Sequence, residues 1–419
     1  MTGAVSADWV LPVDGPPLRN AFVAWEDGRI TEVGEGRAER HYAGAVILPG
    51  LVNAHSHLEY AVYAGFGDGE PFAGWLATHI ARKRALDHDA MLAIARRGAA
   101  DSLAAGITTT ADYSFSGAAV TAAAELGLRA TVYLEVFASD PADAATQFEA
   151  TKSRVEESEL VRIGVSPHAP YTCSVEVYHW ALALGVPVGT HLAESANEND
   201  WLEHGSGPMT ANAAVLVAPT GKRSVGTLEE VLCPELLCAH CVQVEPDEIE
   251  LLAAHGVPVA HCPRSNAMLG CGIAPLTELR AAGLRVGLGT DSPASTPSID
   301  PWEELRAAVY MARARERRPD ALGAGEALRL ATIGAAQALG LDAEIGSLLP
   351  GKRADVTVLS LAGSPYDPVE DPAVGVVFGG SPTGVLETIV DGVSRYRQGE
   401  SAWQEVRSTA SAARRRMLA

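Results

Sequence analysis

Two histidines separated by one residue, in the string Asn53-Ala54-His55-Ser56-His57, are the first side chains in the sequence that could do chemistry. Alternate residues of an extended segment point to the same side, so both imidazoles can bind one ion of the Zn²⁺ type. His191 and Asp291 can complete a set of three nitrogens and one carboxylate oxygen. We therefore expect His55, His57, His191 and Asp291 to hold one divalent metal ion. Zn²⁺ is the expected ion, although the same ligands also accept Fe²⁺ or Mn²⁺.

A carboxylate and a further histidine extend this set to hydrolytic chemistry. Glu194 lies three residues after His191, where it can take a proton from a metal-activated water and pass it to the leaving side of a substrate. His240 can orient that water or polarise the atom where charge develops. Asp291, besides binding the metal, can accept a hydrogen bond from the attacking water. The predicted catalytic residues are thus Glu194, His240 and Asp291. The alternative is a surface glutamate and a histidine bonded to the backbone.

The elements that must position these residues are short apolar runs that alternate with helical stretches. The runs cover residues 46–51, 107–111, 130–136, 161–165, 186–190, 236–239, 257–260 and 286–289. Continuous apolar strands separated by helices indicate a parallel sheet covered on both faces. Eight of them over about 240 residues favour an α/β fold of the (β/α)8 TIM-barrel type over an open sheet. Catalytic groups of such barrels lie at the C-terminal ends of the strands, which is where the residues above occur.

The two ends of the chain have a different character. Short strand-like runs broken by Gly, Asp and Pro occupy residues 21–24, 30–33 and 45–48. The same style resumes at residues 354–361, 374–378 and 385–390, before a basic, helix-like tail. We predict a small composite β-sandwich from residues 1–48 and 350–419, beside a catalytic barrel formed by residues 49–349.

Several strings recur in order over the whole barrel and just beyond it: Pro49–Leu58, Gly106–Thr109, Ser166–Tyr171, His191–Ser195, His261–Asn266, Gly289–Ser292 and Gly351–Asp355. Together they resemble the amidohydrolase superfamily. The similar branch contains cytosine deaminase, S-adenosylhomocysteine/methylthioadenosine deaminase, aminofutalosine deaminase and the triazine hydrolases. The resemblance implies the same metal ligands, Glu194 as proton shuttle, His240 as the water-facing histidine, and a homodimer. Binuclear relatives use a lysine at the end of strand 4; this chain has His168 there, so one ion is expected.

The substrate-binding residues predicted from the resemblance are His168, Trp75, Arg82, Arg84, Ser265 and Asn266. Methylthioadenosine deaminases place a glutamate shortly after a tryptophan to bind the ribose, whereas no glutamate follows Trp75 over the next nine residues. The segments 59–75 and 194–208 look more like aminofutalosine deaminases. Arg82 or Arg84 could then pair with the carboxylate of that substrate, or could simply be helix-surface arginines.

The function expected is hydrolytic deamination of a 6-aminopurine nucleoside with release of ammonia. The best candidate is 6-amino-6-deoxyfutalosine, an intermediate of menaquinone biosynthesis. Adenosine, methylthioadenosine or S-adenosylhomocysteine are alternatives, and hydrolysis of a triazine or another heterocycle is a further one. A catalytically inactive scaffold is the alternative of a different class.

Composition limits the remaining possibilities. The formal net charge of −20 argues against nucleic acid or an anionic membrane as the partner. No apolar run of about 20 residues is present, so no membrane span is expected. The N-terminus lacks the basic and apolar pattern of a signal peptide. The six cysteines suggest no disulfide framework, so a cytoplasmic location is expected.

Overall fold

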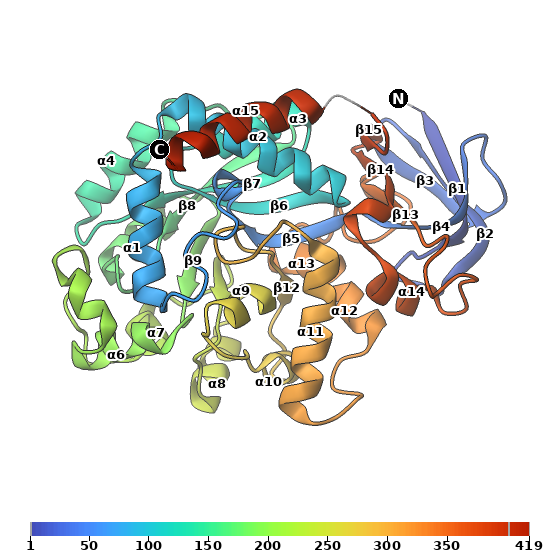
Figure 1. Cartoon of the computed structure of the whole chain (residues 1–419). Coiled ribbons are helices and arrows are strands. Elements are labelled where there is room, and N and C mark those ends of the chain that lie inside the picture. Colours follow the sequence, from blue (N-terminus) through green and yellow to red (C-terminus); the bar gives the residue numbers. More distant parts are fainter. Residues whose placement is uncertain (1, 401–402, 419) are drawn as a thin grey trace.

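Eight parallel strands form a barrel in the computed structural model, which describes residues 2–400 and 403–418 (Figure 1). The strands are hydrogen-bonded in chain order, and the backbone N–H of Asp291 donates to the carbonyl of His55 at 3.0 Å where the last strand meets the first. The predicted (β/α)8 barrel is confirmed. Its strands are β5 (Leu51–Ser56), β6 (Ile107–Ser114), β7 (Arg129–Val136), β8 (Val161–Pro167), β9 (Val188–Leu192), β10 (Leu236–His240), β11 (Val259–His261) and β12 (Val286–Leu288).

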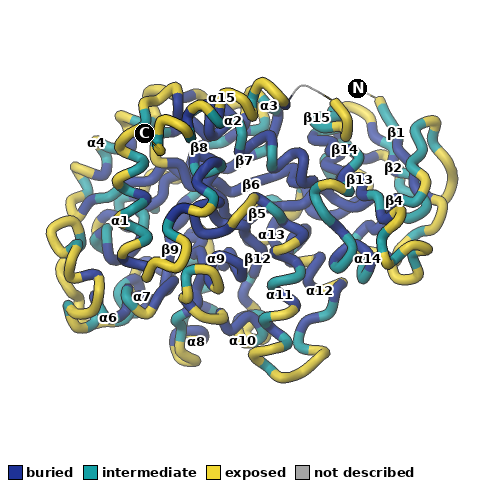
Figure 2. Tube along the Cα trace, in the orientation of Figure 1, coloured by how far each residue is buried: buried dark blue, intermediate teal, exposed yellow. Residues whose placement is uncertain are grey.

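Helices surround the barrel and cover the outer face of its strands, while side chains of the strands fill the interior, so the strands are buried on both faces and dark in Figure 2. Aspartates accept backbone N–H groups at the start of several helices, and proline often takes the first helical position, where no N–H is needed. The helices are α1 (Phe72–Lys83), α2 (His88–Ala104), α3 (Ala118–Leu126), α4 (Pro141–Lys152), α5 (Val175–Ala183), α6 (Ala196–His204), α7 (Ser224–Thr227), α8 (Pro246–Ala254), α9 (Pro263–Met268), α10 (Leu276–Ala281), α11 (Pro301–Glu316), α12 (Ala324–Leu330), α13 (Ile333–Ala338), α14 (Pro372–Gly379) and α15 (Trp403–Leu418).

The terminal segments form a second sheet of seven strands in the order β15-β14-β13-β4-β1-β2-β3. The two ends of this sheet lie close together. Trp25 Nε1 in β2 donates to the carbonyl of Gly392, in the β14–β15 turn, at 3.0 Å. Apolar side chains from both ends of the sheet share one cluster, which gives the expected sandwich. Its strands are β1 (Gly3–Val10), β2 (Leu18–Glu26), β3 (Arg29–Glu35), β4 (His41–Pro49), β13 (Val356–Ser360), β14 (Val385–Val390) and β15 (Val393–Arg397).

The change from one sheet to the other occurs at Gly50, inside the apolar run 46–51 that was expected to be the first barrel strand. That expectation is wrong: residues 46–49 belong to β4 of the terminal sheet, and the first barrel strand, β5, begins at Leu51. A Cβ at Gly50 would lie 2.1 Å from Thr108 Oγ1, so only glycine fits this crossing. The run 374–378 is also misjudged, since it lies in helix α14 behind an Asp371 cap.

The C-terminal helix α15 packs on the barrel helix α2 (Figure 1). Arg416 pairs with Asp87 at 2.7 Å, and Arg414 donates to the carbonyl of Ala64 at 3.0 Å. The tail therefore contacts the barrel, although the sequence groups it with the sandwich; the domain boundaries themselves stay a prediction. Among the residues that the structure describes, no helix combines the length and apolarity that crossing a bilayer needs.

Candidate metal centre and active site

The four residues predicted as metal ligands meet at the C-terminal mouth of the barrel. His55 and His57 come from β5 and the residue after it, His191 comes from β9, and Asp291 follows β12. Asp291 Oδ1 lies 3.6 Å from the Nε2 atoms of both His55 and His57. His57 Nε2 and His191 Nε2 are 3.3 Å apart. The fold thus brings together side chains that are up to 236 positions apart in the chain.

The hydrogen bonds behind these histidines set their tautomers. His57 Nδ1 bonds to the carbonyl of Tyr113 at 2.9 Å, and His191 Nδ1 bonds to the carbonyl of His168 at 2.7 Å. Because a carbonyl only accepts, each Nδ1 carries the proton and each Nε2 presents a lone pair. Two lone pairs at 3.3 Å repel unless a cation lies between them. Burial also lowers the pKa of His57 to about 4, which keeps this ring in the neutral form that binds metals.

The remaining ligand candidates fit the same interpretation. His55 is fully buried, and neither of its ring nitrogens has a hydrogen-bond partner among the described residues. Asp291 is held from behind, since its Oδ2 accepts from the hydroxyls of Ser265 and of Ser295. A neutral imidazole set with one oriented carboxylate is a donor set for a Zn²⁺-like ion. The residues present therefore fit a divalent metal.

A second cluster of potential ligands, formed by Glu135, His168 and His191, lies beside this centre. It shares His191 with the first set. The Nε2 atom of an imidazole has one lone pair, so His191 cannot serve two ions at once. The geometry favours one ion, in line with the absence of a lysine at the end of the fourth strand.

Glu194 and His240 face each other next to the ligands. Glu194 Oε1 lies 3.9 Å from His240 Nε2, and burial raises the pKa of Glu194 to about 7. Burial lowers the pKa of His240, but the carboxylates of Glu194 and Asp291 outweigh it and raise that pKa overall. His240 Nδ1 donates to Asn266 Oδ1 at 3.0 Å. A carboxyl group that titrates near neutrality beside a histidine can exchange protons with a substrate.

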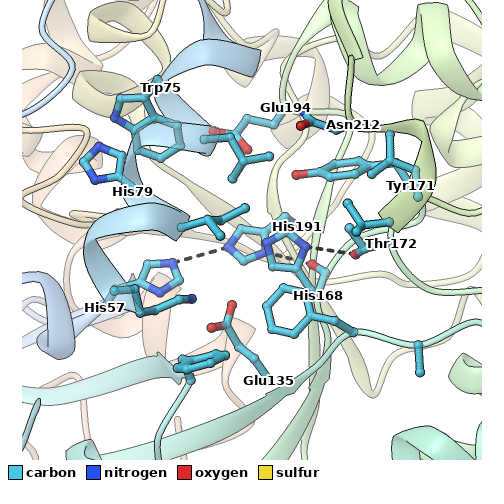
Figure 3. Close-up of a pocket in the computed structure, with 18 of the residues that line it drawn as sticks. His57, Trp75, His79, Glu135, His168, Tyr171, Thr172, His191, Glu194 and Asn212 are labelled. Atoms are coloured by element: carbon cyan, nitrogen blue, oxygen red, sulfur yellow. Dashed lines mark hydrogen bonds between the residues drawn. The ribbon is translucent and has the colours of Figure 1, made fainter. Parts of the chain in front are cut away.

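A large cavity of about 760 Å³ opens over these residues (Figure 3). Trp75, His168 and Arg84 line it, as the sequence predicts for substrate-binding residues. Arg82 does not, because its guanidinium packs over the ring of Phe66 at 3.7 Å. Its prediction as a substrate-binding residue is corrected: one residue further along α1, it is Lys83 that lines the cavity.

Ser265 and Asn266 also need a correction. Both are buried and lie outside the cavity lining, because the first turn of α9 directs them to Asp291 and His240. They position predicted active-site residues and are not placed to touch a substrate.

The residues from 46 to 394 match the amidohydrolase family. The chain belongs to this family. A 5-methylthioadenosine/S-adenosylhomocysteine deaminase of Syntrophobacter fumaroxidans is 34% identical over 405 residues, which cover 91% of this chain and 89% of the relative. A 5'-deoxyadenosine deaminase of Methanothermobacter thermautotrophicus is 31% identical over 93% of this chain and 92% of its own.

Solved structures agree with this membership. An adenosine deaminase from Xanthomonas campestris with bound zinc superposes with a TM-score of 0.88 at 26% identity, covering 99% of this chain and 98% of its own. A triazine hydrolase variant superposes with a TM-score of 0.85 at 24% identity, covering 98% and 99%, which is a likeness of fold. As an amidohydrolase, the protein is a hydrolase that acts on carbon–nitrogen bonds, as the sequence predicts.

Three polar residues of this amidohydrolase site were missed in the sequence. Glu135 and Lys83 line the cavity, and the carboxylate of Glu198 accepts the backbone N–H groups of Ala193 and Glu194 at 3.0 Å each. The signal for Glu135 was available: a carboxylate interrupts the apolar run 130–136 just before its end, at the level where barrel strands present functional groups. Lys83 carried no such signal, because it lies in a helical stretch rich in basic residues.

Proposed function

We propose that the protein is a metal-dependent deaminase that releases ammonia from the 6-amino group of a purine nucleoside. One observation carries the hydrolytic part: His57 and His191 direct two Nε2 lone pairs at one point beside Asp291, with Glu194 next to them. The purine nucleoside is proposed because relatives that are 34% and 31% identical are named as deaminases of such compounds.

The metal ligands in this proposal are His55, His57, His191 and Asp291, and the ion is Zn²⁺. A divalent ion held by these residues would lower the pKa of water towards neutrality and so would supply a nucleophile. Asp291 accepts a hydrogen bond from the attacking water with the carboxylate that Ser265 and Ser295 orient.

Glu194 moves the proton. With a pKa of about 7, its carboxylate takes a proton from the attacking water and delivers it to N1 of the purine ring. His240, held by Asn266, donates from Nε2 when protonated and stabilises the negative charge that develops during attack at C6. The second proton of the water, on the oxygen now bonded to C6, then passes through Asp291 to the amino group, so that the C6–N bond breaks, ammonia leaves and a carbonyl remains at C6.

The identity of the nucleoside is a finer proposal. We retain 6-amino-6-deoxyfutalosine as the candidate from the sequence, because Arg84 gives the cavity a positive charge for its carboxylate. Adenosine, methylthioadenosine and S-adenosylhomocysteine fit the names of the relatives. Hydrolysis of a triazine would use the same metal ligands and the same Glu194, so it remains an alternative. An inactive scaffold is disfavoured because the candidate ligands and acid–base residues are all present. A cytoplasmic homodimer remains the expected state.

The test is an assay of the zinc-loaded protein with these four nucleosides, cytosine and a chlorotriazine. Release of both ammonia and chloride is measured for each compound. One nucleoside should exceed the others in kcat/KM by at least tenfold. Glu194→Gln should lower turnover by a factor of about 10² to 10⁴ while zinc content stays at one ion per chain. Near-normal turnover of this variant, or release of chloride alone, would overturn the proposal.

A further inference from the structure

Glu135 is a buried carboxylate without a hydrogen-bond partner among the described residues. It lies at the end of β7, is only 7% exposed, and lines the cavity. Among the residues that the structure describes, none forms a hydrogen bond or an ion pair with its side chain, whereas buried carboxylates normally have such partners. In Figure 3 it points at the histidines from the side opposite Glu194. The oxygens of this carboxylate are therefore free to accept hydrogen bonds from a ligand in the cavity.

His168 presents a second acceptor beside it. A Glu135 oxygen lies within 4.8 Å of a ring nitrogen of His168. Thr172 Oγ1 donates its proton to the carbonyl of Ala169 at 3.1 Å, so it accepts from His168 Nδ1 at 3.0 Å. The proton of His168 is therefore on Nδ1, and Nε2 is a bare acceptor.

Lys83 supplies the matching donor. Its ammonium group bonds to the hydroxyl of Tyr60 at 3.0 Å and lies 3.8 Å from the centre of the Phe115 ring. No carboxylate in the described ranges forms an ion pair with it. An ammonium group has three N–H bonds, so two of them can still donate. The cavity wall thus combines two acceptors with one donor cation.

A hydroxyl group satisfies both kinds of partner, because it donates one hydrogen bond and accepts others. An amine would satisfy the acceptors, but the Lys83 charge and a divalent ion next to His191 repel a cation. A carboxylate would satisfy Lys83 but would face Glu135. Neutral hydroxyls are therefore the ligand class that this wall fits.

We propose that Glu135, His168 and Lys83 form a subsite that binds neighbouring hydroxyl groups of the substrate's sugar. The proposal rests on the proposed function, since a nucleoside carries a hydroxylated sugar attached to the reacting base. Glu135 comes from a barrel strand, so its position is fixed relative to the metal ligands. In this role it determines specificity and orients the nucleoside, while the proton transfers remain with Glu194.

The test compares adenosine with 2′,3′-dideoxyadenosine in the zinc-loaded full-length protein. Wild type should show a kcat/KM at least tenfold higher for adenosine. Glu135→Ala should lower the adenosine value by about 10- to 100-fold, as expected for a lost hydrogen bond to a charged group, and leave the dideoxy value within about threefold. Lys83→Met should reduce the same preference. Asp143→Asn removes an exposed carboxylate of the same cavity and is the matched control.

Calorimetric binding of both nucleosides to the Glu194→Gln protein gives the same comparison without turnover. If adenosine binds more tightly than the dideoxy compound, and adding Glu135→Ala removes this difference, the subsite is supported. This holds even if wild type releases no ammonia, because the absence of ammonia would overturn only the proposed function. Equal affinities for both nucleosides overturn the subsite. An equal fall for both substrates in Glu135→Ala, or loss of zinc, also overturns it, because either result assigns Glu135 to the metal centre or to folding.

Discussion

Replacing Glu194 by glutamine should raise the free energy of unfolding of the metal-free protein. The same replacement should remove the activity of the zinc-loaded protein. Burial raises the pKa of Glu194 from 4.5 to about 7. The folded state then holds this proton more tightly than the unfolded state, so stability falls as the pH rises from about 4.5 to 7, and the full penalty is present above pH 7. A shift of this size corresponds to about 3 kcal/mol at pH 8 and less than about 1 kcal/mol at pH 5.

The measurement is urea unfolding of chelator-treated wild type and Glu194→Gln at pH 5 and pH 8. The amide cannot ionise, so the variant should gain about 2 to 3 kcal/mol over wild type at pH 8 and clearly less at pH 5. Asp143→Asn, at an exposed position of the same cavity, should give no pH-dependent gain. Two results would refute the conclusion that burial raises the pKa of Glu194 to about 7. One is a variant that is less stable than wild type at pH 8, and the other is a gain in stability that does not depend on pH.

Three further predictions follow from other contacts. Ser265→Ala should weaken zinc binding by about 10- to 100-fold in competition with a chromophoric chelator, because Asp291 loses an orienting hydroxyl; unchanged affinity would exclude this role. Gly50→Ala should lower the free energy of unfolding by about 1–3 kcal/mol through the clash with Thr108, whereas Gly325→Ala, at an open helical position, should not. Removal of metal by a chelator should abolish ammonia release and lower the melting temperature, and both should return with Zn²⁺.

The barrel and the meeting point of the candidate metal ligands could be predicted because both leave local signals in the sequence. Continuous apolar runs mark strands buried on both faces, and the polar residues after them mark one end of the sheet. His55, His57, His191 and Asp291 were found this way without any knowledge of which strands are neighbours. The run 46–51 gives a wrong strand boundary because β4 and β5 are both buried, apolar strands that follow each other directly. The boundary lies at Gly50, where Thr108 approaches the backbone too closely for any other residue.

The side-chain directions at the site could not be predicted in the same way. Ser265, Asn266 and Arg82 follow or flank expected elements, but the turn of a helix decides whether such a residue faces the cavity, a neighbouring side chain or an aromatic ring. That rotation depends on packing between distant segments. Lys83 and Arg82 are adjacent in the sequence, and only the position of α1 against the barrel selects the lysine for the cavity.

The strand ends that carry the catalytic candidates are strained, and this determines how the site should respond to mutation. Ala193, His240 and Asp291 have φ angles of 50°, 76° and 52°, which cost non-glycine residues of order 1–3 kcal/mol each. Of the three residues that hold these positions, Glu198 alone bonds to the strained backbone, at the N–H of Ala193, whereas Asn266 and Ser265 bond to the side chains of His240 and Asp291. Removing the Glu198 carboxylate loses hydrogen bonds but also lets the backbone at Ala193 relax, so the two effects on stability oppose each other. The positions of the reacting atoms have no such compensation, and variants of these holding residues should therefore lose activity more than stability.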